Sequence, residues 1–335
     1  MSKRLWWVDL AKGWTIMLVV TAHSIQGIYK TGAYGSFDLI SKSSMFFLFT
    51  IIMPVFFALS GFVDRPVDSI NSLKNSALKK TVNLIVPYVV FSAIYVALQH
   101  FSNGVNSLYT WKDLLLMFER PIGYMWFLYA LSFVFLIAGI LDVLNFSVPC
   151  QVLIGLIFLV IKQYVALPYF LAVSFTWLVC FECGRILKTY NWLYTSKKFF
   201  YFFSVLILIS LIVQYRQGGM WYDTNTLTIS NSVSKILSIP VAFRVFYYAG
   251  RNKINNYFAK YGKYSLVIYM VHAPATSIFR VLLAKMHITN YFLLVILVIA
   301  LSWMVSVMVI KMCKRSKAVA IVFFPLKVIS NAKIS

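Results

Sequence analysis

Residues 45–63 read MFFLFTIIMPVFFALSGFV, an apolar run without a single charged side chain. A helix of about 20 apolar residues can cross the roughly 30 Å of hydrocarbon in a bilayer. Within such a helix, the backbone N–H and C=O groups are satisfied inside the segment, so no water is needed. The run therefore predicts a membrane-spanning helix.

The remainder of the chain has the same character. Of its 335 residues, 61% are hydrophobic and only 12% are charged, which is more apolar surface than a soluble domain of this length can bury. The alternating ten-residue segments of a transmembrane β-barrel are absent. We therefore expect an all-α polytopic membrane protein with about ten spans. The predicted spans are 7–28, 45–63, 82–100, 124–141, 152–164, 167–187, 199–215, 233–250, 266–284 and 291–310.

The fifth of these spans, 152–164, is the weakest, because it is short and ends at Lys162 and Gln163. If it re-entered the membrane instead of crossing it, every later span would be reversed. Lys and Arg are enriched on the cytoplasmic side, and ten crossings place the basic loops 185–198 and 251–263 on that side. We therefore predict cytoplasmic termini, a single transmembrane domain over 1–311 and a basic cytoplasmic tail over 312–335.

The net charge of +22 does not indicate nucleic-acid binding. The positive residues lie in separate loops next to predicted helices rather than on one continuous face. Membrane lipids with anionic head groups are the expected partner.

Ionisable residues inside predicted spans mark candidate functional sites, because they are expensive in lipid. Asp9, Lys12 and His23 share one face of the first span, and His23 lies about 16 Å further across the membrane than Lys12. Asp9 and Lys12 can also be read as an interfacial ion pair with snorkelling side chains. His23 can be read as a histidine that forms a hydrogen bond between helices.

A second histidine, His272, lies in the ninth span and is followed by Arg280. Imidazole acts as base, acid or nucleophile near neutral pH, so two histidines in the membrane fit proton transfer during group transfer. Zinc is not expected, because no third ligand accompanies them. Cys180 and Cys183 have CxxC spacing, but in an apolar helix they read as small buried side chains. We predict no metal and no bound cofactor.

Four blocks of sequence carry a resemblance that extends across most of the chain. They are WVDLAKG at 7–13 running to His23, MPVFFALSGF at 53–62 with Lys79-Lys80 and VPY at 86–88, WFL at 126–128, and YGKYSL at 261–266 followed by Tyr269 and His272. Their order resembles the integral membrane acyltransferases of family three. Within that family the chain is similar to the sugar O-acetylases typified by fucose 4-O-acetylase-like proteins.

The chain departs from this family at some positions. The family more often has arginine at the place of Lys12, and an Arg-x-x-Arg pattern where this chain has Lys80 and Asn83. Lysine offers a point charge rather than a bidentate fork for phosphate. Some members also have a histidine before the WFL block, where this chain has Tyr124 and Met125.

The resemblance implies transfer of an acetyl group from cytoplasmic acetyl-coenzyme A, as co-substrate, to a carbohydrate hydroxyl, with Lys12 and His23 as the essential pair. His23 would be either the general base or a transient acyl carrier. Lys12, near Asp9, would guide the thioester, and His272 would orient the acceptor or shuttle a proton. Substrate-binding residues are expected at Lys79, Lys80, Trp126, Tyr269 and Arg280.

The expected acceptor is a cell-surface or lipid-linked polysaccharide, such as the O-antigen of a lipopolysaccharide, and the expected location is the bacterial inner membrane. Two other functions stay open. A polytopic transporter or flippase for a glycan or lipid-linked sugar would use the polar face without making a bond. A glycan-modifying enzyme with a lipid-linked sugar donor would use outer-loop carboxylates, namely Asp113, Glu119 and Asp223.

Overall fold

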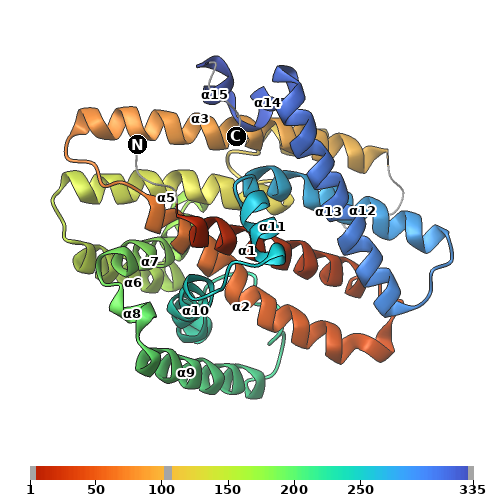
Figure 1. Ribbon diagram of the computed structural model, residues 1–335, viewed down its shortest axis with the longest axis horizontal. Helices are drawn as coiled ribbons and strands as arrows, with labels where there is room; N and C mark the ends of the chain where they lie inside the picture. Colours follow the sequence, from red (N-terminus) through yellow and green to blue (C-terminus); the bar gives the residue numbers. More distant parts are fainter. Residues whose placement is uncertain (1–4, 102–107, 331–335) are drawn as a thin grey trace. The chain divides into compact units, whose positions relative to one another are not determined.

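The computed structural model describes residues 5–101 and 108–330, and throughout these ranges the regular structure is helical, without a strand (Figure 1). The all-α prediction is confirmed. The described residues form two compact units. The first draws on Met1–Thr15, Met45–Ser76 and Phe133–Lys263, and the second on Ile16–Ser44, Ala77–Ser132 and Tyr264–Ser335.

The long helices coincide with the predicted spans. Among the described residues, seven helices are long and apolar enough to cross a membrane, namely α2, α3, α5, α7, α9, α12 and α13. Helix α6 is shorter, and α1 and α10 fall outside this group, so the number of ten crossings stays a prediction. The helices that match the ten spans are α1 (Trp6–Tyr29), α2 (Asp38–Val63), α3 (Ile70–His100), α5 (Trp126–Val143), α6 (Val148–Tyr164), α7 (Tyr169–Thr189), α9 (Lys197–Arg216), α10 (Ile229–Tyr247), α12 (Ser265–Lys285) and α13 (Tyr291–Arg315).

Shorter helices fill several connections. They are η1 (Gly35–Phe37), α4 (Trp111–Leu115), η2 (Gly123–Met125), α8 (Trp192–Thr195), α11 (Lys253–Gly262), α14 (Lys317–Phe323) and α15 (Pro325–Ile329). Helices α14 and α15 belong to the predicted basic tail, of which residues 331–335 lie outside the described part of the chain. Phe323 of α14 is buried, and its ring lies 5.2 Å from that of Phe91 on α3. This part of the tail is therefore packed within the second unit.

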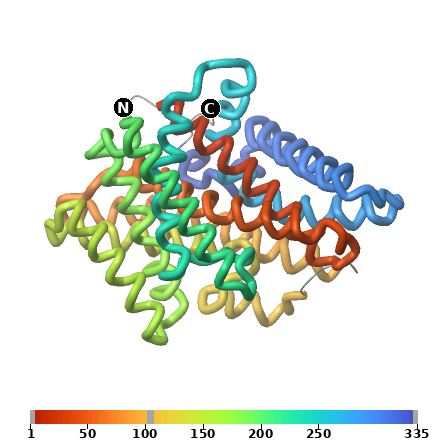
Figure 2. Tube along the Cα trace, turned by 90° about the horizontal axis from the view of Figure 1, so that it is seen from below, coloured from red at the N-terminus to blue at the C-terminus, as the bar shows by residue number. Residues whose placement is uncertain are grey.

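The first unit has an aromatic core. Helix α6 packs on α7, and α10 packs on both α7 and α9, as Figure 2 shows for the green segments. Phe57 of α2 stacks on Trp177 of α7 at 5.0 Å between ring centroids. Trp7 at the start of α1 meets Phe62 and Phe243 edge-on. Such offset and edge contacts are the favoured geometries of buried aromatic pairs.

The second unit is closed by a cluster at the ends of its helices. Ile28 near the end of α1, Leu283 near the end of α12 and Tyr291 at the start of α13 are buried together. The hydroxyls of Tyr291 and Ser41 of α2 form a hydrogen bond of 2.8 Å. Helices α12 and α13 lie side by side (Figure 1). The last turns of α1 and α12 therefore meet at one end of the unit, beside the first turns of α2 and α13.

Candidate functional site

The two histidines predicted from the sequence lie against each other in the second unit. The ring centroids of His23 on α1 and His272 on α12 are 5.2 Å apart. His272 is fully buried, whereas His23 is partly exposed. Although 249 positions separate them in the chain, the structure brings them into one site.

Hydrogen bonds assign the proton of each imidazole. Nδ1 of His272 lies 2.6 Å from the main-chain oxygen of Tyr269, and Nδ1 of His23 lies 3.2 Å from Oε1 of Gln26. Carbonyl oxygens only accept, so both Nδ1 atoms donate. In a neutral ring the other nitrogen then carries a lone pair. Both histidines therefore present Nε2 as a base or nucleophile, and Nε2 of His272 has no hydrogen-bond partner.

Pro274 explains why main-chain carbonyls are available in α12. A proline within a helix has no N–H for the carbonyl four residues earlier, which here is that of Met270. The Tyr124 hydroxyl donates to this carbonyl at 2.7 Å. In return the Tyr269 hydroxyl donates to the main-chain oxygen of Tyr124. The turn that carries His272 is therefore fixed from outside the helix.

Aromatic rings pack around His272. The rings of Tyr124 and Tyr269 lie 5.4 Å and 5.5 Å from that of His272. Phe127 of the WFL block is buried and lies 5.2 Å from Tyr269, whereas Trp126, which was predicted to bind substrate, is half-buried beside it. The WFL block therefore reaches the site through Phe127, and Tyr124, two residues before the block, contacts His272 directly.

Arg280 continues the same face of α12, about two turns beyond His272. It is 9% exposed. A Cβ added at Gly27, one turn beyond His23, would lie 3.7 Å from Cδ of Arg280. Within the second unit, the interface of α1 and α12 thus carries the two imidazoles and a guanidinium in succession.

The other residues predicted for the first span lie in the first unit. Asp9 is buried and Lys12 is half-buried, on the same unbroken helix α1 as His23. Here α1 touches α11, because a Cβ at Gly13 would lie 2.1 Å from the oxygen of Phe258, and one at Gly262 would lie 1.9 Å from that of Asp9. The WVDLAKG and YGKYSL blocks therefore meet through their glycines.

The two lysines predicted to bind phosphate lie on α3 in the second unit. Lys79 is exposed and Lys80 is half-buried. Both side chains therefore present positive charge near the surface of that unit, where a polyanion can reach Lys79 without displacing the core.

Sequence reasoning missed a buried charge cluster in the first unit. Arg185 at the end of α7 binds Asp142 at the end of α5 with two hydrogen bonds, of 2.9 Å and 2.5 Å. Its guanidinium also lies 3.4 Å from Asp64 and 3.5 Å from Glu182. Glu182 lies one turn before Arg185 on α7 and belongs to the same cluster. The only sequence signal was charge close to the ends of three predicted spans.

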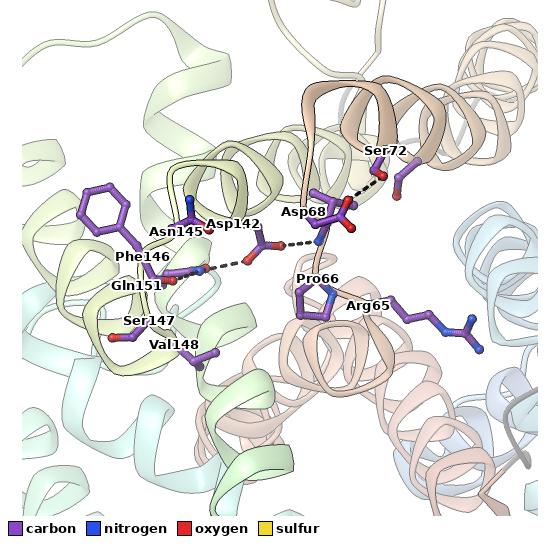
Figure 3. Close-up of a pocket in the computed structure, with 12 residues that line it drawn as sticks. Arg65, Pro66, Asp68, Ser72, Asp142, Asn145, Phe146, Ser147, Val148 and Gln151 are labelled. Carbon is purple, nitrogen blue, oxygen red and sulfur yellow. Dashed lines mark hydrogen bonds between the residues drawn. The ribbon is translucent and has the colours of Figure 1, made fainter.

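A cavity of about 600 Å³ adjoins this cluster. Figure 3 shows the Asp142 carboxylate between the Gln151 side chain and the main-chain N–H of Val67, with Arg65 directed away from it. Eight of the twelve lining residues are polar or charged, but the carboxylates among them are already engaged. Asp142 accepts from Arg185 and Gln151, and Asp68 accepts from two serine hydroxyls.

Ligand sets for a metal were sought in the described ranges. Within residues 5–101 and 108–330, no group of three or more His, Cys, Asp or Glu side chains could hold a metal ion. Cys180 and Cys183 are free thiols on α7 of the first unit.

Comparison with known proteins adds one finding. A family model described as an acyltransferase domain, family 3, matches residues 5–307, which is nearly the whole chain. Neither a curated protein nor a solved structure gives a significant match.

Proposed function

The chain belongs to acyltransferase family 3, and from this premise we propose that it is a membrane O-acetyltransferase. Its donor is acetyl-coenzyme A on the cytoplasmic side. Its acceptor is a hydroxyl of a cell-surface or lipid-linked polysaccharide, of the kind that fucose 4-O-acetylase-like enzymes modify. The location is a bacterial inner membrane.

The observation that carries this proposal is the contact between two imidazoles, His23 and His272, whose ring centroids are 5.2 Å apart. Acyl transfer from a thioester to a hydroxyl needs a group that accepts the hydroxyl proton or carries the acyl group in transit. A neutral imidazole can do either. The rings of Tyr124 and Tyr269 pack against His272, which is 0% exposed, and they limit the access of water to that imidazole.

Lysine side chains bind and guide the donor, acetyl-coenzyme A, in this proposal. Lys79 and Lys80 bind the phosphates of coenzyme A, whose charges are attracted to ammonium groups. Lys12, held on α1 beside Asp9, guides the thioester towards His23 along the same helix. Because Lys80 and Asn83 replace the family's Arg-x-x-Arg, the grip on phosphate in this chain depends on point charges and is expected to weaken in high salt.

In this proposal, ten crossings with cytoplasmic termini put the donor and the acceptor on opposite sides of the membrane. The first unit supports the fifth crossing, which is the weakest of the predicted spans. There the end of α5, the start of α6 and the end of α7 meet around Arg185, through Asp142 and Gln151. Helix α6 packs along α7, so it runs from this end of the unit to the end where α7 begins. With 17 residues against the 21 of α7, it covers most of the length of that helix.

The second unit supports the same topology. His23 and Gly27 of α1 lie against His272 and Arg280 of α12 in the same order along both helices, so the two helices are parallel. Spans one and nine run in the same direction only if an odd number of crossings separates them. Spans two to eight make seven crossings and satisfy this condition. If the fifth span did not cross, six would remain and the condition would fail.

The test is label transfer by the purified protein in lipid nanodiscs. Radiolabelled acetyl-coenzyme A is offered together with a panel of surface polysaccharides and lipid-linked glycans. We expect label in a glycan with the wild type, none with His23→Asn, and undiminished transfer with His287→Asn, an exposed histidine that serves as the matched control. A transporter or flippase would transfer no label to any glycan, and that result with the wild type would refute the proposal.

A further inference from the structure

We propose that the two histidines divide the reaction, with Nε2 of His23 carrying the acetyl group and Nε2 of His272 removing the proton from the acceptor hydroxyl. This inference rests on the proposed acetyltransferase function. It assigns His272 a catalytic role of its own, distinct from orientation of the acceptor.

The different burial of the two rings favours this division. An acyl carrier must be reached by the thioester and must then accommodate an acetyl group on its nitrogen. His23 is partly exposed, and its Nδ1 partner is the side chain of Gln26, which can move with the ring. His272 is 0% exposed. A thioester therefore has less access to His272 than to His23, whereas a base needs contact only with the hydroxyl proton.

The rigidity of His272 suits a base. Its Nδ1–H is held by the Tyr269 carbonyl, and the neighbouring Met270 carbonyl is held by the Tyr124 hydroxyl. The main-chain oxygen on Nδ1 stabilises the imidazolium that forms when Nε2 takes a proton, as a carboxylate does in other catalytic histidines. The unpartnered Nε2 atom is therefore aligned in advance.

The closeness of the two rings suits a shared acceptor. A reacting oxygen must lie about 3 Å from both the centre it attacks and the base that takes its proton. The ring centroids of His23 and His272 are 5.2 Å apart, so a hydroxyl that attacks an acetyl carbon on His23 also lies near His272.

The steps balance as follows. Nε2 of His23 attacks the thioester carbonyl, the N–C bond forms, the C–S bond breaks, and coenzyme A leaves as a thiolate. The acceptor oxygen then attacks the acetyl carbon, the O–C bond forms, and the N–C bond breaks with its electron pair returning to Nε2. The hydroxyl proton passes to Nε2 of His272, which returns it to the thiolate. One acetyl group moves from sulfur to oxygen and one proton from oxygen to sulfur.

Isotope exchange tests the division, because it needs no acceptor. If His23 carries the acetyl group, the purified protein exchanges label between acetyl-coenzyme A and free radiolabelled coenzyme A. Asparagine is the matched substitution at both positions, since its amide nitrogen can replace Nδ1 as a donor to Gln26 or Tyr269 but offers no counterpart of Nε2. Detergent-solubilised protein with an unchanged melting temperature confirms that each variant is folded.

His23→Asn should lose both exchange and transfer to a glycan. His272→Asn should keep exchange within about threefold of the wild type, while transfer to the glycan falls about 100-fold or more, the usual contribution of a general base. The proposal is overturned if His272→Asn loses as much exchange as His23→Asn. It is also overturned if His272→Asn transfers acetyl to the glycan as fast as the wild type.

The wild type separates this inference from the function beneath it. Transfer to a glycan without exchange would leave the acetyltransferase standing and overturn the acyl carrier. If the wild type shows neither exchange nor transfer, the proposed acetyltransferase function is overturned, and the division of roles falls with it.

Discussion

The hydroxyl of Tyr124 donates to the main-chain carbonyl of Met270 at 2.7 Å. Met270 lies four residues before Pro274, so its carbonyl lacks the helical donor that any other residue at position 274 would supply. The Tyr124 side chain, which precedes helix α5, thus supplies the missing donor to helix α12, two residues before the buried His272.

Removal of this hydroxyl should destabilise the protein in a way that a second substitution repairs. Tyr124→Phe leaves a buried carbonyl without a donor, which costs about 1–3 kcal/mol. Pro274→Ala restores an N–H to the helix, so the double variant should recover most of that loss. Unfolding in detergent micelles measures the four free energies of this cycle. Strictly additive losses would contradict the proposed relationship.

A similar repair occurs at Pro54 in α2 of the first unit. Pro54 leaves the Thr50 carbonyl without its helical donor, and this carbonyl accepts from the Ser238 hydroxyl at 3.3 Å. The neighbouring carbonyl of Phe49 accepts from Nζ of Lys235 at 2.6 Å. Lys235 is fully buried and also donates to the Thr224 carbonyl at 2.7 Å.

Lys235→Met should therefore remove the Lys235 donor from two buried carbonyls, of which that of Thr224 lies outside a helix, and destabilise the protein by about 1–3 kcal/mol. Lys285→Met, at an exposed lysine, is the matched control and should change stability by less than about 0.5 kcal/mol. Thermal unfolding of the two purified variants distinguishes them. Equal melting temperatures would show that the Lys235 contacts contribute nothing.

The charge cluster of the first unit predicts a larger loss. Arg185→Met removes the cationic partner of the Asp142 and Asp64 carboxylates. The side chains of Arg185 and Asp142 are only 4% and 6% exposed, so water cannot replace the lost contact. Breaking a buried ion pair by removing one partner typically costs about 3–5 kcal/mol. We expect little protein to accumulate in membranes.

Two comparisons sharpen that experiment. Arg185→Lys keeps the charge but loses the bidentate contact with Asp142, so its membrane level should lie between those of the wild type and Arg185→Met. Asp38→Asn breaks the surface pair with Lys42 and should be nearly neutral. Normal accumulation of Arg185→Met would refute a structural role for the cluster.

Acid should loosen the first turn of α3. The Ser72 hydroxyl, and then that of Ser69, donate to the Asp68 carboxylate and hold its pKa below the usual value. A depressed folded-state pKa gives stability that is present above the unfolded pKa and is lost as the pH falls through the folded pKa. Hydrogen exchange at the start of α3, corrected for intrinsic rates, should therefore accelerate in acid. In Asp68→Asn this acceleration should be absent, and its persistence would point to another group.

Much of the helical framework was predictable, because lipid forces each apolar run to satisfy its own backbone groups. His23 and His272 were predictable for a related reason, since an imidazole in a membrane span requires a specific role. Their contact was not, because nothing in the sequence sets which helices are neighbours. Tyr124 was noted only as a departure from a family pattern, although Pro274 signals that Met270 needs a donor.

The Arg185 cluster was missed for the same physical reason. Asp64, Asp142 and Arg185 stand near the ends of three predicted spans, where charge is ordinary and each residue alone reads as interfacial. Only the packing of α2, α5 and α7 in the first unit turns them into a buried network. Short-range patterns identify elements, whereas long-range ion pairs depend on the assembled core.

The central claim is that acetyl transfer to a glycan takes place at the histidine pair. It is tested most directly by the ester-linked acetate of surface glycan, released with mild alkali from cells that depend on this protein. Cells with the wild type or His287→Asn should release acetate, and cells with His23→Asn or His272→Asn should release only background amounts at equal membrane levels of the protein. Wild-type acetate release from cells with His23→Asn would contradict the account.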